Sequence, residues 1–291
     1  MKSDNHGYGD NRKSAITNRQ SIITLLTDFG TQDYFVGAMK GVILSKNPDA
    51  QIIDITHDIP PQDIESAAFN LLACYRNFPA GSIHVAIVDP GVGSERRALI
   101  VACAEQFFVG PDNGLFSWIC EREVQWRAVQ ATNERFFRHP ISNTFHGRDI
   151  FAPVAAALSM GRELHEFGPF VEDIVCRDSL NPTKIDDLTI QGRVVHIDRF
   201  GNCVTNLTKE MLRSAGSATA WRIAVGTQEI NSFHAFFAEA SDGEVFCTSG
   251  SAGFLEISVR NASAAKLLRV ERGQPVIFSA SRLTEVAPRT G

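Results

Sequence analysis

The stretch that most constrains the fold is a run of mainly apolar residues, His84 to Val88, that ends at Asp89-Pro90-Gly91. Short runs rich in β-branched residues are typical of a strand buried on both faces of a parallel sheet. The next three residues predict a turn, because Pro fixes φ and Gly permits positive φ. An acidic side chain therefore follows the carboxyl end of a buried strand, where open α/β sheets bind their ligands.

Strand and helix patterns alternate before this run. The expected elements are strands at 22–26, 51–55 and 82–88 and helices at 35–43 and about 63–75. The first helix is expected to be capped by Thr31 or Asp33. This alternation is the signature of a mostly parallel sheet covered by helices.

The pattern changes in the second half of the chain. A hairpin is expected at 98–103 and 106–109, and an amphipathic helix at 150–160. A polar stretch at 178–187 is followed by short alternating strands, which predict a small β-barrel or β-sandwich. The expected organisation is a disordered tail at 1–20, an α/β domain at 21–178 and a smaller all-β barrel domain at 188–284.

Composition excludes several classes of protein. The net charge of −5 over 291 residues argues against general nucleic-acid binding, which needs a basic surface. No apolar run approaches the length of a membrane span, and we expect no signal peptide. The six cysteines form no C-x-x-C pair, so we expect buried thiols in a reducing cytoplasm instead of disulfides or a zinc site.

Two arginines, Arg96 and Arg97, follow Asp89 on a short Gly-rich loop. In the simplest interpretation the loop is a surface turn with a solvated basic pair. Alternatively Asp89 is buried, Arg96 supplies the partner that a buried carboxylate needs, and the pair holds a water molecule. His146 precedes Gly147 at a helix start, where the backbone can approach a ligand closely.

Two further polar clusters stand out. Asp28 and Asp33 flank a Gly turn after the first strand and could bind ribose hydroxyls or a divalent cation, although helix capping also explains Asp33. In the β domain, turn residues at 198–202, 251–254 and 260–262 include aromatic and amide side chains. An aromatic beside a Gly-Asn turn suits a purine face and an amino-acid head group.

Taken together, these motifs resemble the S-adenosyl-L-methionine (SAM) hydrolases, also called SAM hydroxide adenosyltransferases, which are relatives of fluorinase and chlorinase. The matching segments occur in family order from about residue 21 to 280. They are Thr27-Asp28-Phe29-Gly30 with Asp33, Asp54-Ile55-Thr56-His57, Val88-Asp89-Pro90-Gly91-Val92-Gly93 with Arg96, Gly110-Pro111-Asp112-Asn113-Gly114, Phe145-His146-Gly147-Arg148-Asp149, Asp198-Arg199-Phe200-Gly201-Asn202 and Gly253-Phe254-Leu255-Glu256-Ile257.

The resemblance implies an N-terminal α/β domain, a C-terminal β-barrel and a homotrimer whose sites lie between subunits. It implies that Asp89, Arg96 and His146 handle the attacking water. The implied substrate ligands are Asp28 for the ribose hydroxyls, Asp198, Asn202 and Ser251 for the methionine part, Phe200 and Phe237 for the adenine faces, and the backbones of Asn261 and Ala262 for the adenine edge. The match at Phe237 is loose, because three phenylalanines lie within 233–237.

Halogenating relatives would carry an aromatic residue at the position of Asp89 and an insertion after the following strand. Here the position is acidic and the link from Ala98 to Asp112 is short, both as in the hydrolases. Arg260 departs from the pattern beside the adenine loop, and the sequence assigns it no contact.

The expected reaction is attack of water on the ribose C5′ of SAM, which gives adenosine and L-methionine without a cofactor or metal. Two alternatives stay open at this point. Asp28 and Asp33 have the five-residue spacing of a calcium-dependent nucleoside hydrolase. A non-catalytic nucleoside sensor would use Asp89 and Arg96 only as a structural pair.

Overall fold

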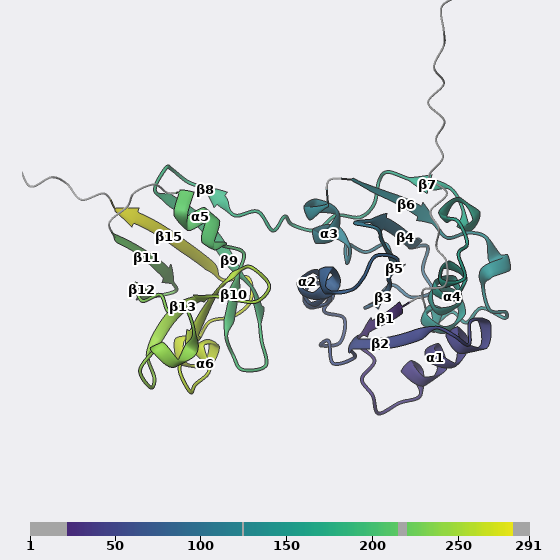
Figure 1. Cartoon of the computed structure of the whole chain (residues 1–291), viewed down its shortest axis with the longest axis horizontal. Helices are drawn as coiled ribbons and strands as arrows, with labels where there is room; N and C mark the ends of the chain where they lie inside the picture. Colours follow the sequence, from purple (N-terminus) through teal and green to yellow (C-terminus); the bar gives the residue numbers. More distant parts are fainter. Residues whose placement is uncertain (1–21, 124, 215–219, 282–291) are drawn as a thin grey trace, which may run out of the picture.

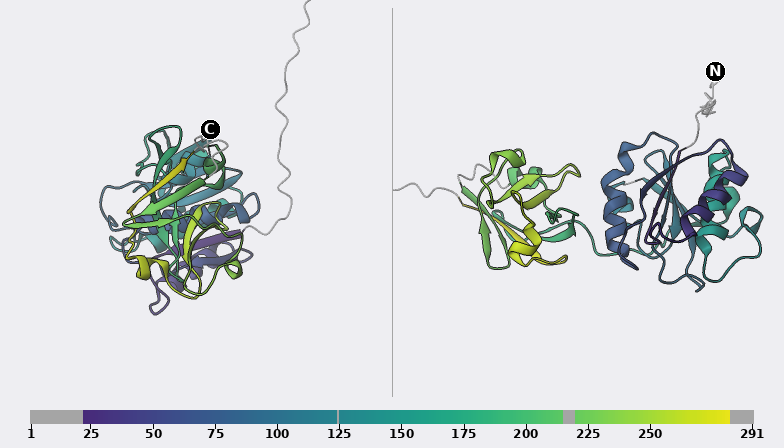
Figure 2. Two further views of the ribbon diagram at one scale, coloured as in Figure 1. Left: turned by 90° about the vertical axis from the view of Figure 1, so that its left-hand side faces the viewer. Right: turned by 90° about the horizontal axis from the view of Figure 1, so that it is seen from below.

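The computed structural model describes residues 22–123, 125–214 and 220–281. Two bodies lie side by side, one built from the N-terminal part of the chain and one from the C-terminal part (Figures 1 and 2). The expected tail at 1–20 lies outside the described residues. Within the described residues, no helix is long and apolar enough to cross a membrane.

The first body is built on a seven-stranded sheet with the order β2-β1-β3-β5-β4-β6-β7. Its strands are β1 (Ile22–Thr27), β2 (Gln51–Thr56), β3 (Ile83–Ile87), β4 (Ala98–Cys103), β5 (Gln106–Pro111), β6 (Trp126–Gln130) and β7 (Phe170–Val171). Strands β2, β1, β3 and β5 run parallel, and β4 forms the expected antiparallel hairpin with β5. The helix-covered, largely parallel sheet is therefore confirmed.

Helices cover both faces of this sheet, as Figure 2 shows. They are α1 (Phe35–Lys46), α2 (Ile64–Cys74), α3 (Ser117–Arg122) and α4 (Ala152–Ser159), with 3-10 turns η1 (Tyr75–Asn77), η2 (Glu134–Phe136) and η4 (Leu164–Phe167) and the π-helix η3 (Gly147–Phe151). Helices α1 and α4 share one apolar core with the sheet, and α2 and α3 share a second core on the other face.

Two local predictions in this body are wrong. Tyr34, in helical conformation, precedes α1 and no side chain caps it, so neither Thr31 nor Asp33 is the cap. Helix α4 is not amphipathic: every residue from Ala152 to Leu158 is buried, because α4 packs between α1, the sheet and η2. The cap of α2 follows the expected pattern, since the Asp63 carboxylate accepts a hydrogen bond from the Ser66 amide.

The second body is an antiparallel, nearly closed barrel, as the sequence predicts. Its strand order is β12-β11-β15-β9-β10-β14-β13, with β8 paired to β9. The elements are β8 (Thr183–Lys184), β9 (Thr189–Ile197), β10 (Cys203–Thr205), β11 (Ala220–Val225), β12 (Gln228–Ile230), β13 (Val245–Ser249), β14 (Leu255–Val259), β15 (Pro275–Ser281), α5 (Lys209–Ser214), α6 (Ala264–Leu268) and η5 (Phe237–Glu239). The domain limits at 178 and 188 stay predictions, and β8 lies between them.

Helices α2 and α3 both contact the second body, and in α3 the Arg122 guanidinium lies over the Phe254 ring at 5.5 Å. Glu65 pairs with Arg193 of β9 at 2.9 Å, and the α2 cap residue Asp63 pairs with Arg272 at 2.5 Å. The Phe69 ring stacks on His196 with centroids 4.5 Å apart. Ion pairs and a ring stack from α2 therefore hold the β-barrel against the α/β domain, together with the contact from α3.

A buried histidine in β3 predicts a pH-dependent stability. His84 is fully buried, with Nδ1 2.8 Å from the Thr24 hydroxyl and Nε2 3.2 Å from the Gln106 side-chain oxygen. Burial lowers the pKa of His84 from its ordinary value of 6.5 to about 4. The unfolded chain therefore binds more protons between these pH values, so the free energy of unfolding falls as the pH drops through the window, by about 3 kcal/mol in total.

We expect His84→Gln to remove this part of the pH dependence. Urea unfolding of both proteins at pH 7 and pH 4.5 measures the difference. An unchanged pH slope in the variant would show that His84 is not the titrating group.

Candidate active site

Asp89 and Arg96 form a buried ion pair just beyond β3. The Arg96 Nε donates to Oδ1 of Asp89 at 2.9 Å, and Nη2 donates to Oδ2 at 2.5 Å. The side chain of Asp89 is only 5 % exposed and that of Arg96 only 10 %. The solvated-turn interpretation is therefore wrong, because the loop folds Arg96 back onto the carboxylate.

His146 joins this pair from 50 residues further along the chain. Its Nδ1 lies 2.7 Å from Nη2 of Arg96. A guanidinium can only donate, so Nδ1 must accept and the proton of the neutral ring is on Nε2. Burial and then the Arg96 charge lower the pKa of His146, against the opposite effect of Asp89 and Asp149, so the ring is neutral at pH 7.

Two glycines allow the loops of the triad to meet. At Gly93, where φ is +79°, a Cβ atom would collide with the carbonyl of Asn143, so the loop after β3 packs directly on the segment before His146. At Gly147 a Cβ would press on Met39 and Ile87. Glycine is the residue that fits both close approaches.

A π-helix begins directly after His146. This wide turn spans Gly147–Phe151, and such turns occur often at functional sites. The ring of Phe151, at its end, lies under the Arg96 guanidinium at 5.2 Å. Arg96 is therefore held by a carboxylate, an imidazole and an aromatic face, and no sequence pattern predicted the third contact.

Asp149 anchors the segment that leads to His146. The carboxylate is fully buried, accepts from the Ser142 amide at 2.9 Å and pairs with Arg138 and Arg148. Burial would raise its pKa, but the hydrogen bonds from Arg148, Ser142 and Arg138 lower it. Asp149 is therefore a structural carboxylate that orders residues 138–146.

Asp28 lies on the turn after β1, at the same carboxyl edge of the sheet as Asp89. Its Oδ2 accepts from the backbone amide of Gln62 at 2.8 Å. Within the described residues, its Oδ1 has no protein partner, so it is available to a ligand hydroxyl. Asp33 lies exposed on the same turn.

In the second body, Asp198 closes the loop between β9 and β10. Its carboxylate accepts from the amides of Phe200 and Asn202 at 2.9 Å each and from the Asn202 side chain at 2.8 Å. This arrangement leaves Phe200 on the outside of the loop, 78 % exposed. Three of the four lone-pair positions of the carboxylate are occupied, so it can accept one more hydrogen bond.

Arg260 connects two of the loops expected to bind adenine. Its guanidinium donates to the carbonyl of Ala238 at 3.0 Å and pairs with Asp242 at 3.2 Å. Asn261 adopts a left-handed conformation, and its side chain also donates to Asp242, at 2.8 Å. Arg260 thus ties the loop after Phe237 to the loop that carries Asn261.

The remaining expected ligands lie on the same barrel. Gly201 packs on Ser263, directly after Ala262, and its carbonyl accepts from the Ala265 amide at 2.9 Å. Ser251 is exposed on the turn between β13 and β14. Near that turn, burial and then the Asp198 charge raise the pKa of Glu256.

The structure therefore brings the expected residues together in two groups. The first joins Asp89, Arg96 and His146, with Asp28 at the same sheet edge. The second gathers the loops of Asp198, Asn202, Phe200, Phe237, Ser251, Asn261 and Ala262 on the barrel. Within the described residues of one chain, no hydrogen bond, ion pair or ring contact joins the two groups.

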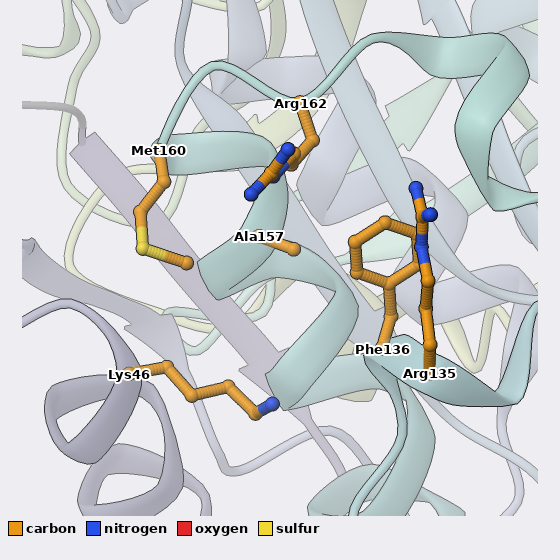
Figure 3. A pocket seen from close by; sticks show the side chains of 6 residues that line it. All are labelled: Lys46, Arg135, Phe136, Ala157, Met160 and Arg162. Carbon is orange, nitrogen blue, oxygen red and sulfur yellow. The ribbon is translucent and has the colours of Figure 1, made fainter.

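A cavity of about 390 Å³ lies elsewhere, at the C-terminal ends of α1 and α4 (Figure 3). It is lined by Lys46, Arg135, Phe136, Ala157, Met160 and Arg162. Both arginines lie near the Glu166 carboxylate, at 2.6 Å and 3.8 Å. Because α1 runs back from the carboxyl edge of β1, this cavity is at the opposite edge of the sheet and shares no residue with the triad.

The acidic, histidine and cysteine side chains of the described residues do not cluster as the ligands of a metal ion do. Across 22–123, 125–214 and 220–281, no group of three or more His, Cys, Asp or Glu side chains converges. Asp28 and Asp33 do not gain a third acidic neighbour at their turn.

Family models match both bodies. The SAM hydroxide adenosyltransferase N-terminal domain matches residues 23–168, and the SAM hydroxide adenosyltransferase C-terminal domain matches residues 192–277. The two matches together cover most of the chain.

Curated relatives align over nearly their whole length. The (R)-S-adenosyl-L-methionine hydrolase of Methanocaldococcus jannaschii is 39% identical over 266 residues, which are 86% of this chain and 92% of the relative. The enzyme of the same name from Thermus thermophilus is 34% identical over 87% of this chain and 98% of its own. A fluorinase from Nocardia brasiliensis is 26% identical over 88% of this chain and 95% of its own length.

Solved structures share the fold. An uncharacterized conserved protein from Thermotoga maritima superposes with a TM-score of 0.82 at 33% identity, over 88% of this chain and 99% of that one. A conserved hypothetical protein from Thermus thermophilus superposes with a TM-score of 0.71 at 31% identity, over 90% of this chain and 100% of that protein.

Proposed function

We propose, because the chain belongs to the SAM hydroxide adenosyltransferase family, that it hydrolyses S-adenosyl-L-methionine to adenosine and L-methionine. The observation that supports this best is the buried contact of Asp89, Arg96 and His146 at the carboxyl edge of the sheet. The family resemblance assigns these three groups to the handling of water, and the fold brings His146 from a distant segment onto the pair formed by one loop.

The proposed step is a displacement at the ribose C5′. A water oxygen forms a bond to C5′, the bond from C5′ to sulfur breaks, and its electron pair stays on sulfur as the neutral thioether of methionine. The proton lost by the water passes to Asp89 and then to solvent. No cofactor or metal is needed, because the substrate carries its own sulfonium leaving group.

The triad would orient and polarise the water. Asp89 accepts a hydrogen bond from it, and Nη1 of Arg96, which has no partner among the described residues, can donate to its oxygen. The Nε2 proton of His146 supplies a second donor as the water loses its proton to Asp89, when the oxygen gains the further lone pair that attacks C5′. Positioning of the two reactants can lower the barrier by about 7–11 kcal/mol in favourable cases.

The charge change along the reaction restricts where carboxylates are useful. The sulfonium loses its positive charge, so an anion placed against sulfur would stabilise the substrate more than the transition state. The family resemblance assigns Asp28 to the ribose hydroxyls, Asp198, Asn202 and Ser251 to the methionine part, and Phe200, Phe237, Asn261 and Ala262 to adenine. These assignments keep the acidic groups near oxygens and the amino group.

A product assay tests the proposal. Incubation with SAM followed by chromatography is expected to show adenosine and methionine in equal amounts, unchanged by EDTA. The relatives are named for the (R) form, so we expect faster turnover of SAM with that sulfonium configuration. A free base that disappears with EDTA would favour a metal-dependent nucleoside hydrolase, and no product would favour a nucleoside sensor.

We also propose a homotrimer with sites between subunits. Aromatic side chains are exposed near both groups of one chain: Tyr34, whose ring packs on that of Phe145, by 67%, Phe200 by 78% and Phe237 by 44%. The two groups make no contact within the described residues, although both are assigned to one substrate. A second copy that presents its barrel to the sheet edge would cover these side chains and complete the site.

Mixing two inactive variants tests this arrangement. Asp89→Asn disables the sheet-edge half, and Phe200→Asp, at an exposed position, disables the barrel half. After random subunit exchange at equal amounts, one site in four combines two intact halves, so about a quarter of the parent activity should return. If exchange is shown by mass spectrometry and activity stays absent, the sites are not shared.

The cysteines support the proposed cytoplasmic location. All six are free, and burial raises the pKa of five of the thiols to about 11 or 12. Such thiols are unreactive and do not require an oxidising compartment. Cell fractionation that finds the protein outside the cytoplasm would contradict this location.

A further inference from the structure

We propose that His57 is a positioning residue for ribose recognition, because it fixes the turn that carries Asp28. The inference rests on the proposed function, since it concerns how that site holds the ribose of its substrate. It assigns a role to a residue that makes no contact with the triad.

His57 holds both ends of the Asp28 turn. It is 4 % exposed, and its Nδ1 lies 2.8 Å from the hydroxyl of Thr27, the residue before Asp28. The same hydroxyl accepts from the amide of Phe29 at 3.2 Å. The His57 carbonyl accepts from the amide of Gly30 at 2.8 Å. Residues on either side of Asp28 are thus bonded to one buried histidine.

The neighbours of His57 favour one tautomer. Its Nε2 lies 3.1 Å from Oδ1 of Asp54, close but not aligned as a hydrogen bond. Asp54 is ionised at neutral pH and pairs with Lys40 at 2.6 Å. A carboxylate beside Nε2 favours the proton on that nitrogen, so Nδ1 accepts from the Thr27 hydroxyl and Thr27 is left with lone pairs for Phe29.

This arrangement fixes the direction of the Asp28 carboxylate. The backbone of Phe29 is held by the Thr27 hydroxyl, and Oδ2 of Asp28 is held by the Gln62 amide at 2.8 Å. Oδ1, which has no protein partner among the described residues, then faces a ligand in one fixed direction, and Oδ2 keeps one further lone pair. A hydrogen bond to a charged acceptor discriminates strongly between a hydroxyl and a hydrogen, provided that the acceptor cannot turn away.

The chain contains an internal control for this geometry. Thr24 and His84 form a second pair on β1 and β3, with the same atoms at the same 2.8 Å. This pair contacts Gln106 instead of a turn that carries a ligand group. Loss of a buried threonine–histidine hydrogen bond can therefore be separated from loss of the Asp28 turn.

The experiment compares the affinities of adenosine and 2′-deoxyadenosine by calorimetry. We expect the parent protein to prefer adenosine by at least about tenfold. His57→Leu and Thr27→Val should each reduce this preference to less than about threefold and raise the KM for SAM, while kcat at saturation changes by less than about threefold. His57→Asn, whose amide oxygen can replace Nδ1, should restore part of the preference. His84→Leu should lower the unfolding temperature and keep the preference.

The outcomes separate this inference from the proposed function. If the parent protein binds both nucleosides equally, Asp28 is not a ribose ligand and the assigned site is wrong. If the parent discriminates and folded His57→Leu or Thr27→Val discriminates equally well, only the role of His57 is overturned. An equal loss of preference in His84→Leu would also overturn it, because the effect would then be a general one on the sheet.

Discussion

Asp89→Asn is expected to lower kcat for SAM hydrolysis by about 10³-fold while the Kd of SAM changes by less than about fivefold. The amide keeps the shape of the side chain and can still accept from Arg96, but it provides no charged acceptor for the attacking water. Single-turnover formation of adenosine gives the rate, and calorimetry under conditions of slow turnover gives the affinity.

Glu95→Gln is the matched control for this substitution. Glu95 is exposed on the same loop, directly before Arg96, so the same change from carboxylate to amide should leave kcat within about twofold of the parent. An Asp89→Asn protein that turns over SAM within tenfold of the parent rate would show that Asp89 is not part of the reaction.

Arg96→Met is expected to lower both kcat and the free energy of unfolding by large amounts. It removes the partner of a carboxylate that is 5 % exposed and the donor to His146. We expect a fall in kcat of about 10³-fold and a fall in the free energy of unfolding of about 3–5 kcal/mol, as for other broken buried pairs. Kinetics and urea unfolding measure the two effects separately.

The adjacent Arg97 separates these two effects. Arg97 pairs with Asp112, whose side chain is 3 % exposed, and with Asp173. Arg97→Met should therefore lower stability by a similar amount and leave kcat within about threefold. The double variant Asp89→Asn/Arg96→Met should lose little more activity than either single variant, because the groups act as a unit. Additive losses would argue against a shared water-binding role.

The elements of the fold could be predicted where one periodicity dominated. Strands β1 to β3 and helices α1 and α2 follow from their apolar patterns, although in β2 these apolar residues lie half-buried or exposed. The amphipathic prediction for α4 failed because its alanines are buried on every side, which a pattern of small residues does not reveal. Strand β6, with its mixed sequence Trp126–Gln130, was missed because its burial depends on β4 and β7.

The candidate site was predictable to a different degree. Asp89 and Arg96 are close in sequence, so a short loop was enough to suggest their contact. His146 was singled out by its position before Gly147, but its link to this pair came from the family resemblance, because no local signal connects residues 50 positions apart. The contacts of His57 with Thr27, and of Arg260 with Asp242, depend on packing between strands and loops that spacing does not encode.

The contact between the two bodies begins one residue from the Asp28 site. Gln62 donates to Asp28, and the next residue, Asp63, pairs with Arg272 of the barrel. The Asp28 carboxylate and the barrel are therefore connected through two consecutive residues of the chain. If nucleoside affinity depends on the angle between the domains, reciprocity requires the bound nucleoside to narrow the range of angles that the domains sample.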